Sequence, residues 1–191
     1  MKLPTQDECF RIIREMNMMD HIIDHSVMVS NVALCLGRHL KKQNPLIDIE
    51  LTRSAALLHD ITKTRSFDTG EMHSKTGGIL LEEMGYPEVA DIVRQHVILD
   101  IYMEDAPVSE HEIVNYADKR VLHDQVVSLD RRLKYIKVKY GAKKEFQSKL
   151  QAMWDMTLEL EIKLFRHLPF LPSQLSEKVI PNIRKKPFPC I

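Results

Sequence analysis

The sequence predicts an all-α protein built from a single helical domain. Only six glycines and 6% aromatic residues occur in 191 residues, alternating stretches of Val, Ile and Thr are few, and apolar residues recur at helical spacing instead. The length suits one domain. We expect one helical domain over residues 1–167. Because five prolines follow, we expect an irregular tail over residues 168–191.

Capping residues and helix breakers divide the chain into separate helices. Thr5 is a suitable cap for the first helix, and Asn44-Pro45 ends the second. Residues 63–71 carry a Thr-Gly pair and are expected to form a loop. The expected helices cover residues 6–18, 24–41, 49–62, 73–84, 87–99, 109–122, 124–140 and, after a break at Gly141, a last stretch to about His167.

Composition excludes several classes of protein. Twenty-seven Lys and Arg balance twenty-seven Asp and Glu, so no overall charge attracts nucleic acid or anionic lipid. Three cysteines without a CxxC pair indicate a reducing compartment. No apolar run reaches the roughly 18 residues of a membrane span, and the first ten residues lack the apolar core of a signal peptide. A cytoplasmic protein with no membrane partner is therefore expected.

Six polar residues stand where a helix should bury its side chains. Three of them have Val, Ile or Leu one or two turns away on the same helix face. Two more are neighbours in the apolar string SAALLHDI, and the sixth opens a helix whose next turn holds a Gly-Gly pair. These residues are His25, His59, Asp60, His73, His96 and Asp118.

Each of these residues has an ordinary explanation when it is taken alone. A single inward histidine is hydrogen-bonded to a backbone carbonyl roughly three times in four. Ordinary hydrogen bonds do not account as easily for all six residues together. Buried carboxylates need charge partners, and we expect no Lys or Arg on the same stripes. A shared divalent metal centre satisfies all six. Nitrogen and oxygen ligands without cysteine suit Mn, Fe, Co, Ni or Zn in an open catalytic site.

The order of these residues resembles the HD-domain superfamily of metal-dependent phosphohydrolases, in its HDIG-like branch. The likeness extends from about residue 1 to residue 141, and the combined spacing is far more specific than the His-Asp pair alone. Thr62 departs from that branch, which often has glycine there, although threonine is tolerable in a helix. The strings that carry the resemblance are DHSVMVSNVA, AALLHDITK, MHSKTGGILLEEMGYPEVADIVRQH and YADKRV.

The resemblance implies two metal ions that share Asp60. The first ion would be held by His25, His59, Asp60 and Asp118, and the second by Asp60, His73 and His96. Two such ions bind a phosphate oxygen and lower the pKa of a water molecule. We expect catalytic roles for Asp60 and for Lys63, whose long cationic side chain suits a phosphate oxygen. A solvated surface lysine is an equally weighted alternative.

The expected function is hydrolysis of a phosphoester or phosphoanhydride bond by metal-activated water. The expected substrate is a small phosphorylated molecule, a nucleotide or dinucleotide, and no organic cofactor is implied. One alternative is a regulatory protein that binds metal and nucleotide without turnover. Another is a helical scaffold with incidental histidines, which would bind no stoichiometric metal.

The region from Lys119 to Lys149 holds ten Lys and Arg against three acids. A solvated helix face is favoured about two to one over a nucleotide-facing or RNA-facing surface, so a nucleic-acid partner is not expected. Lys119 and Arg120 are expected to point away from Asp118 and to form ion pairs. The apolar helix around Trp154 is expected in the core, with a homodimer contact as the alternative.

The remaining histidines are expected to lie outside the metal centre. His39 shares a face with His25 but lies about 21 Å further along the helix, too far to bind the same ion. The four expected on the surface are His21, His111, His123 and His167.

Overall fold

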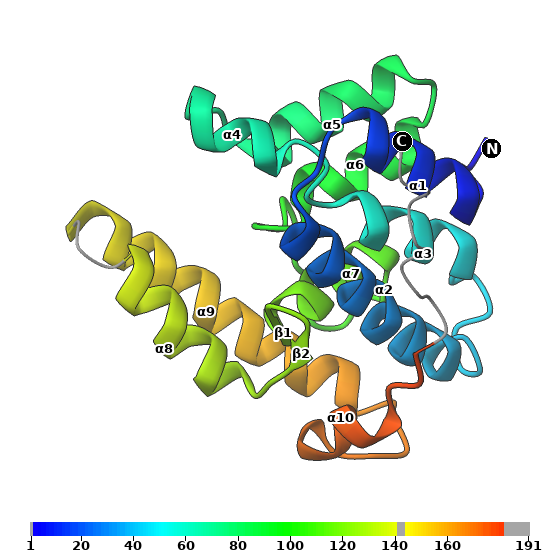
Figure 1. Cartoon of the computed structure of the whole chain (residues 1–191). Coiled ribbons are helices and arrows are strands. Elements are labelled where there is room, and N and C mark those ends of the chain that lie inside the picture. The colour runs from blue at the N-terminus through cyan, green and yellow to red at the C-terminus, as the bar shows by residue number, and fades with distance from the viewer. Residues whose placement is uncertain (1, 141–143, 182–191) are drawn as a thin grey trace.

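The computed structural model describes residues 2–140 and 144–181, without the side chains of residues 140, 144–147 and 149 (Figure 1). Its regular structure is helical apart from one short antiparallel pair of strands, which confirms the all-α prediction. The elements are α1 (Gln6–Glu15), α2 (Asp20–Leu40), α3 (Ile49–Leu58), α4 (Lys63–Thr69), α5 (His73–Glu83), α6 (Pro87–Gln95), α7 (Glu110–Lys119), β1 (Val121–Leu122), β2 (Gln125–Val126), α8 (Leu129–Tyr140), α9 (Lys144–Phe165), a 3₁₀ turn (Pro172–Gln174) and α10 (Leu175–Lys178).

Reciprocal side-chain caps mark the starts of α1 and α7. The Thr5 hydroxyl accepts a hydrogen bond from the backbone N–H of Glu8 while the Glu8 carboxylate accepts one from the backbone N–H of Thr5. The same reciprocal pair joins Ser109 and Glu112 at the start of α7. Each pair satisfies backbone donors that a helix N-terminus leaves unpaired.

The central helix α2 packs against α3 and α7, and α5 packs closely against α6 (Figure 1). The α5–α6 contact depends on the Gly-Gly pair, because a Cβ on Gly78 would lie 3.1 Å from the Ala90 carbonyl oxygen. Helices α8 and α9 form a hairpin that extends away from this body, and α9 also packs against α7 (Figure 1). The polar residues described below are held by α2, α3, α5, α6 and α7.

Residues 63–71 are not the loop that was predicted. Residues 63–69 form helix α4, which ends at Gly70 in the left-handed conformation with φ of 70°. None of its residues is buried, so the sequence carries no apolar periodicity that would reveal a helix.

The region around residue 123 also differs from the prediction of two consecutive helices. Helix α7 ends at Lys119, and β1 and β2 form a hairpin whose turn is His123-Asp124, with φ of 56° at His123. Without the glycine that usually marks such a turn, the hairpin had no sequence signal. Other boundaries were shifted: helices expected at 6–18, 24–41, 49–62, 87–99 and 124–140 run instead over 6–15, 20–40, 49–58, 87–95 and 129–140. The predicted break at Gly141 lies outside the described residues.

The segment after residue 167 packs on the body as far as Val179. Phe170 and Leu175 are buried in the core, and the Arg120 guanidinium donates to the Pro172 carbonyl at 2.8 Å. Trp154 is also buried, as predicted, whereas Ile162 on the same helix is 62% exposed. Among the described residues, we find no helix that is both long and apolar enough for a membrane span.

Candidate metal centre

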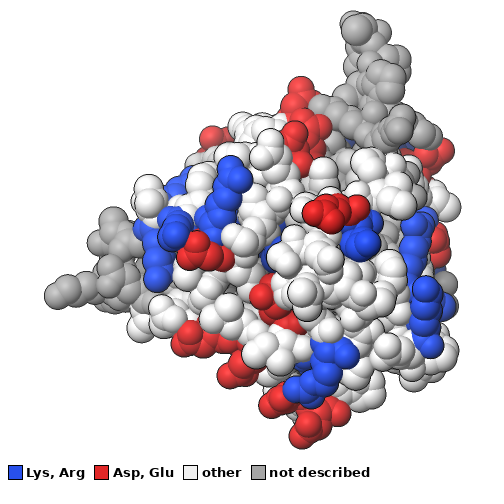
Figure 2. Space-filling view, turned by 90° about the horizontal axis from the view of Figure 1, so that it is seen from below, with Lys and Arg blue, Asp and Glu red and all other residues white. Residues whose placement is uncertain are grey.

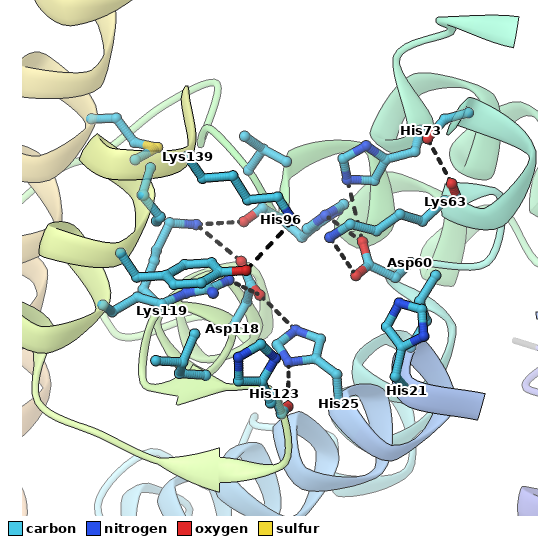
Figure 3. A pocket seen from close by; sticks show the side chains of 18 of the residues that line it. His21, His25, Asp60, Lys63, His73, His96, Asp118, Lys119, His123 and Lys139 are labelled. Carbon is cyan, nitrogen blue, oxygen red and sulfur yellow. Dashed lines mark hydrogen bonds and ion pairs between the residues drawn. The ribbon is translucent and has the colours of Figure 1, made fainter. Parts of the chain in front are cut away.

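The structure brings all six predicted residues together: five of them line one pocket (Figure 3), and His59 lies beside Asp60 without lining it. Five segments far apart in the chain supply them, and each segment places its side chain at or just beyond a helix end or on a buried helix face. His25 comes from α2, His59 and Asp60 directly follow α3, His73 opens α5, His96 directly follows α6, and Asp118 lies in the last turn of α7.

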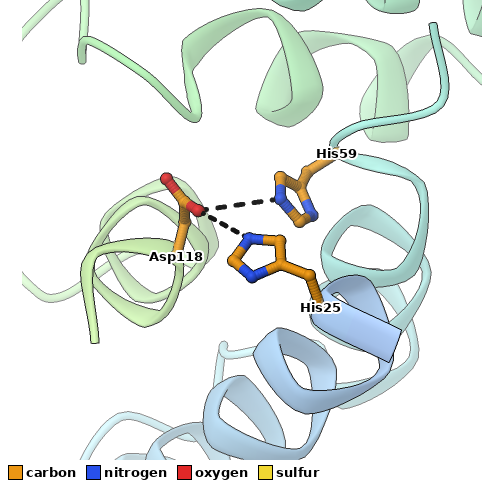
Figure 4. Close-up of side chains that lie close together, drawn as sticks. All are labelled: His25, His59 and Asp118. Carbon is orange, nitrogen blue, oxygen red and sulfur yellow. Dashed lines mark hydrogen bonds and ion pairs between the residues drawn. The ribbon is translucent and has the colours of Figure 1, made fainter. Parts of the chain in front are cut away.

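A first cluster joins three of these residues (Figure 4). His25 Nε2 lies 3.0 Å and His59 Nε2 3.8 Å from Asp118 Oδ1. His59 Nε2 also lies 3.4 Å from Oδ2 of Asp60. The three candidate ligand atoms of His25, His59 and Asp118 all lie within 4.8 Å of one another, which is close enough to surround one ion.

A second cluster is centred on the other oxygen of Asp60. His73 Nε2 lies 3.2 Å and His96 Nε2 3.6 Å from Asp60 Oδ1. Ligand atoms of His59, Asp60 and His96 also lie within 4.8 Å of one another. Asp60 therefore presents one oxygen to each cluster, and its side chain is only 1% exposed.

Backbone carbonyls fix the tautomer of three histidine rings. His25, His59 and His96 each donate from Nδ1 to a carbonyl, at 2.9, 2.8 and 2.7 Å; the acceptors are His123, Ala56 and Val93. When neutral, such a ring has an unprotonated Nε2. All three Nε2 atoms face carboxylate oxygens, and among the described atoms His59 Nε2 and Asp60 Oδ1 are buried without a hydrogen-bond partner. Lone pairs that face each other in a buried site call for a cation between them, so these residues fit a divalent metal.

We expected no Lys or Arg on the stripes that carry the two carboxylates, but a lysine from the next helix supplies Asp60 with a charge partner. Lys63 Nζ lies 2.8 Å from Asp60 Oδ2, because α4 begins one turn after Asp60 and directs this side chain back. Burial would raise the pKa of Asp60, but the Lys63 ammonium beside it outweighs burial and holds that pKa well below its usual range. The carboxylate is thus ionised and able to bind a cation.

Lys119 does not point away from the centre as predicted. It is buried at the pocket, donates to the His96 carbonyl at 2.7 Å and lies 3.8 Å from Asp118. Burial lowers the pKa of Lys119 to about 8. Arg120 does form the expected ion pair, 3.2 Å from Glu161.

The centre opens into a pocket of about 610 Å³. His21 and His123 are exposed, as predicted, but both line this pocket (Figure 3). Arg132, Tyr135 and Lys139 of α8 also line it. None of these three was predicted as a site residue, although their spacing of three and four residues places them on one helix face.

The other histidines are engaged elsewhere. His39 Nδ1 donates to the Cys35 carbonyl at 2.8 Å, and His111 Nε2 lies 2.7 Å from Asp91. His167 is exposed. None of these three lines the pocket at the metal centre.

Residues 22–124 match the model of the HD domain family. The chain belongs to the HD domain family. All six residues of the centre fall inside that match, whereas α8 and α9 lie beyond it. The HD domain is thus the part of this chain that carries the candidate metal ligands.

Similar proteins include an uncharacterized protein of Methanocaldococcus jannaschii, 29% identical over 64% of this chain and 79% of its own length. A tRNA (cytidine(56)-2'-O)-methyltransferase of Picrophilus torridus is 32% identical over 74% of this chain, which spans only 42% of that relative. A crystal structure of a predicted HD superfamily hydrolase from an uncultured Thermotogales bacterium is similar over 86% of this chain and 94% of its own, with 22% identity and a TM-score of 0.47.

Proposed function

We propose that this HD-domain protein is a metal-dependent phosphohydrolase that cleaves a phosphoester or phosphoanhydride bond of a nucleotide-type small molecule. The observation that carries the proposal is the meeting of three Nε2 atoms, each fixed by a carbonyl on its Nδ1, with the buried carboxylate of Asp60 and the partly buried carboxylate of Asp118. Purely structural histidines have no need to turn unprotonated nitrogens toward carboxylate oxygens.

The proposed ligands form two sets that share Asp60. One set is His25, His59, Asp60 and Asp118, and the other is Asp60, His73 and His96. When bound, divalent ions of the Mn, Fe, Co, Ni or Zn type polarise a phosphoryl oxygen and lower the pKa of a water molecule.

The chain's own residues supply the binding and orientation around that chemistry. The carbonyls on Nδ1 hold three imidazole rings in fixed orientations, so little reorganisation is needed when a ligand arrives. Lys63 is hydrogen-bonded to Asp60 and lines the pocket, so we assign it a contact with a phosphate oxygen of the substrate. His21 and His123 at the pocket wall offer further donors to the substrate.

A small substrate fits the surface better than a nucleic acid does. On the face seen in Figure 2, basic and acidic side chains are interspersed, unlike the continuous basic surface of most nucleic-acid-binding proteins. The pocket of about 610 Å³ instead has the volume of a small-molecule site. Methyl transfer is not proposed, because the chain spans less than half of the methyltransferases it resembles.

Elemental analysis joined to a phosphate-release screen tests this proposal. Purified protein, reconstituted with each candidate metal, is expected to hold up to two ions and to release phosphate from one class of mononucleotide, dinucleoside polyphosphate, cyclic dinucleotide or generic phosphoester. Absence of bound metal after reconstitution would refute the centre. Stoichiometric metal and nucleotide binding without turnover would support instead a regulatory binding protein, the rival function.

The number of ions is tested by His73→Ala, with His111→Ala as the matched control. The two side chains are 24% and 30% exposed, so the stability costs should be similar, but only His73 belongs to the centre. Metal content should fall from about two ions to about one in His73→Ala alone. Full occupancy in that variant would refute the dinuclear assignment.

A further inference from the structure

Two side chains of α7 hold the end of α6, the helix that His96 directly follows. Asn115 Nδ2 donates to the Gln95 carbonyl at 3.0 Å, and Lys119 Nζ donates to the His96 carbonyl at 2.7 Å. Asn115 and Lys119 are four residues apart and therefore share one face of α7. Because the last carbonyls of a helix have no partner within that helix, these two bonds tie down the backbone that carries the His96 ring.

The direction of the His96 ring depends on this backbone. Its Nδ1 donates to the Val93 carbonyl at 2.7 Å, and its Nε2 lies 3.6 Å from Asp60 Oδ1. Residues 96–109 form no helix or strand, so regular structure holds His96 only on its N-terminal side. The contacts that α7 makes across the fold are therefore the ones that fix the end of α6 and, with it, the ring.

Lys119 contacts one residue of each proposed ligand set (Figure 3). Besides its bond to the His96 carbonyl, its Nζ forms an ion pair with Asp118 Oδ2 at 3.8 Å. The other oxygen of Asp118 faces His25 Nε2 at 3.0 Å. Both Asn115 and Lys119 are buried, so neither side chain is free to reorient. Helix α7 thus carries Asp118 itself and also the support of His96.

We propose that Asn115 and Lys119 are positioning residues, which hold His96 in the second ligand set and thereby set the affinity of that set for a divalent cation. This inference rests on the two ligand sets of the proposed function. Partners that orient a metal ligand commonly change metal affinity by about 10 to 100 times when they are removed. Neither residue is itself one of the six candidate ligands.

A neutral change at Asn115 tests the proposal without altering charge. Leucine has nearly the shape of asparagine but no donor, so Asn115→Leu removes the bond to the Gln95 carbonyl. Metal-stripped protein is titrated calorimetrically with Mn²⁺. The wild type should bind two ions, and Asn115→Leu should bind one of them about tenfold more weakly.

Asn44→Leu is the matched control. Asn44 Nδ2 donates to the Val108 carbonyl at the same 3.0 Å, and Asn44 does not line the pocket at the metal centre. This variant should bind Mn²⁺ as the wild type does. Unchanged binding in Asn115→Leu, or an equal loss in Asn44→Leu, would overturn the proposal.

Lys119→Met separates positioning from charge, because the two effects have opposite signs. Removing a cation beside Asp118 removes repulsion toward a metal ion and would tighten Mn²⁺ binding. Loss of the His96 support instead weakens the binding of one ion, which is the result we expect. Lys163→Met is the control, since Lys163 is equally buried and donates to the Met103 carbonyl at 2.8 Å. It should lose stability but not metal affinity.

Tighter or unchanged Mn²⁺ binding in Lys119→Met would overturn the positioning role of Lys119. If Lys119→Met does not fold, Asn115→Leu decides alone. The affected site is identified in a His73→Ala background, which should keep only the first ion. There, Asn115→Leu should not weaken the remaining ion, and a further loss would overturn the assignment to the set of His96.

Turnover separates failure of this inference from failure of the hydrolase function. Phosphate release by Asn115→Leu and Lys119→Met should recover at saturating Mn²⁺, with KM unchanged. A raised KM in Lys119→Met at saturating Mn²⁺ would make Lys119 a substrate contact and overturn its positioning role. Weakened Mn²⁺ binding in a protein that hydrolyses no substrate supports the inference and refutes the hydrolase. Phosphate release with unchanged Mn²⁺ affinity in both variants overturns the inference alone, and a wild type that binds no Mn²⁺ overturns both.

Discussion

The change Thr62→Val should weaken one metal site and leave the other intact. Thr62 is fully buried, and its hydroxyl donates to the His73 carbonyl at 2.8 Å and contacts the Thr76 hydroxyl at 2.9 Å. It thereby ties the first residue of α5, a proposed ligand, to the start of α4. Valine has nearly the same shape but no hydroxyl, so the change removes this tie and little packing.

The expected cost follows from the contacts that are lost. One buried hydrogen bond contributes about 1 to 1.5 kcal/mol, which lowers the melting temperature by roughly 2 to 6 °C in a chain of this size. A ligand that loses its supporting partner binds metal about 10 to 100 times more weakly. Calorimetric titration of the Thr62→Val variant with metal should therefore show two sites, of which one binds metal more weakly than in the wild type.

Thr157→Val is the matched control. Thr157 is equally buried, and its hydroxyl donates to the Met153 carbonyl at 2.8 Å, within α9 and away from the metal centre. This variant should lose stability but not metal affinity. If both variants bind both ions as the wild type does, Thr62 does not position His73. Equal weakening of the two sites in Thr62→Val would show that the two clusters are not separable.

Three further predictions test the centre and its surroundings. Asp60→Ala should remain folded but lose activity by orders of magnitude, since one oxygen faces each cluster; near-normal turnover would remove Asp60 from the mechanism. Burial lowers the pKa of His96 from 6.5 to about 4, so the native protein binds fewer protons than the unfolded chain, and metal-free protein should lose stability as pH falls from 6.5 to 4. Denaturation midpoints measured across this pH range should fall less in His96→Gln than in the wild type. The same pH dependence in both proteins would contradict this role of His96. Burial raises the pKa of the Cys9 thiol to about 12, so a thiol reagent at about pH 8 should label Cys9 only after unfolding, as peptide mass mapping can show.

The metal centre was predictable because its residues break a pattern. A histidine or aspartate among Val, Ile and Leu at helical spacing is visible in the sequence, as at His25 and Asp118, and the structure brings these residues together. Helix starts with reciprocal side-chain caps, such as Thr5, were predictable for the same local reason. Whether each of these side chains binds a metal ion remains a prediction.

Other parts of the site could not be read from the sequence, because their surroundings come from distant segments. The α8 residues Arg132 and Lys139 belong to a basic run that is typical of a solvated face, and only packing shows that they line a pocket. Lys119 was assigned the wrong direction because the group that it contacts, the His96 carbonyl, comes from a distant segment at the end of α6. Helix α4, with no buried residue, has no apolar side to detect.

The hydrogen bond between His25 Nδ1 and the His123 carbonyl joins residues 98 positions apart. His123 occupies the hairpin turn, and the chain runs from β2 directly into α8. A ligand that draws α8 inward would therefore pull on the support of the His25 ring, a proposed metal ligand. By thermodynamic reciprocity, metal that orders this ring must in turn favour the ligand-bound position of α8. Metal and substrate would then bind cooperatively, through a carbonyl that contacts neither of them.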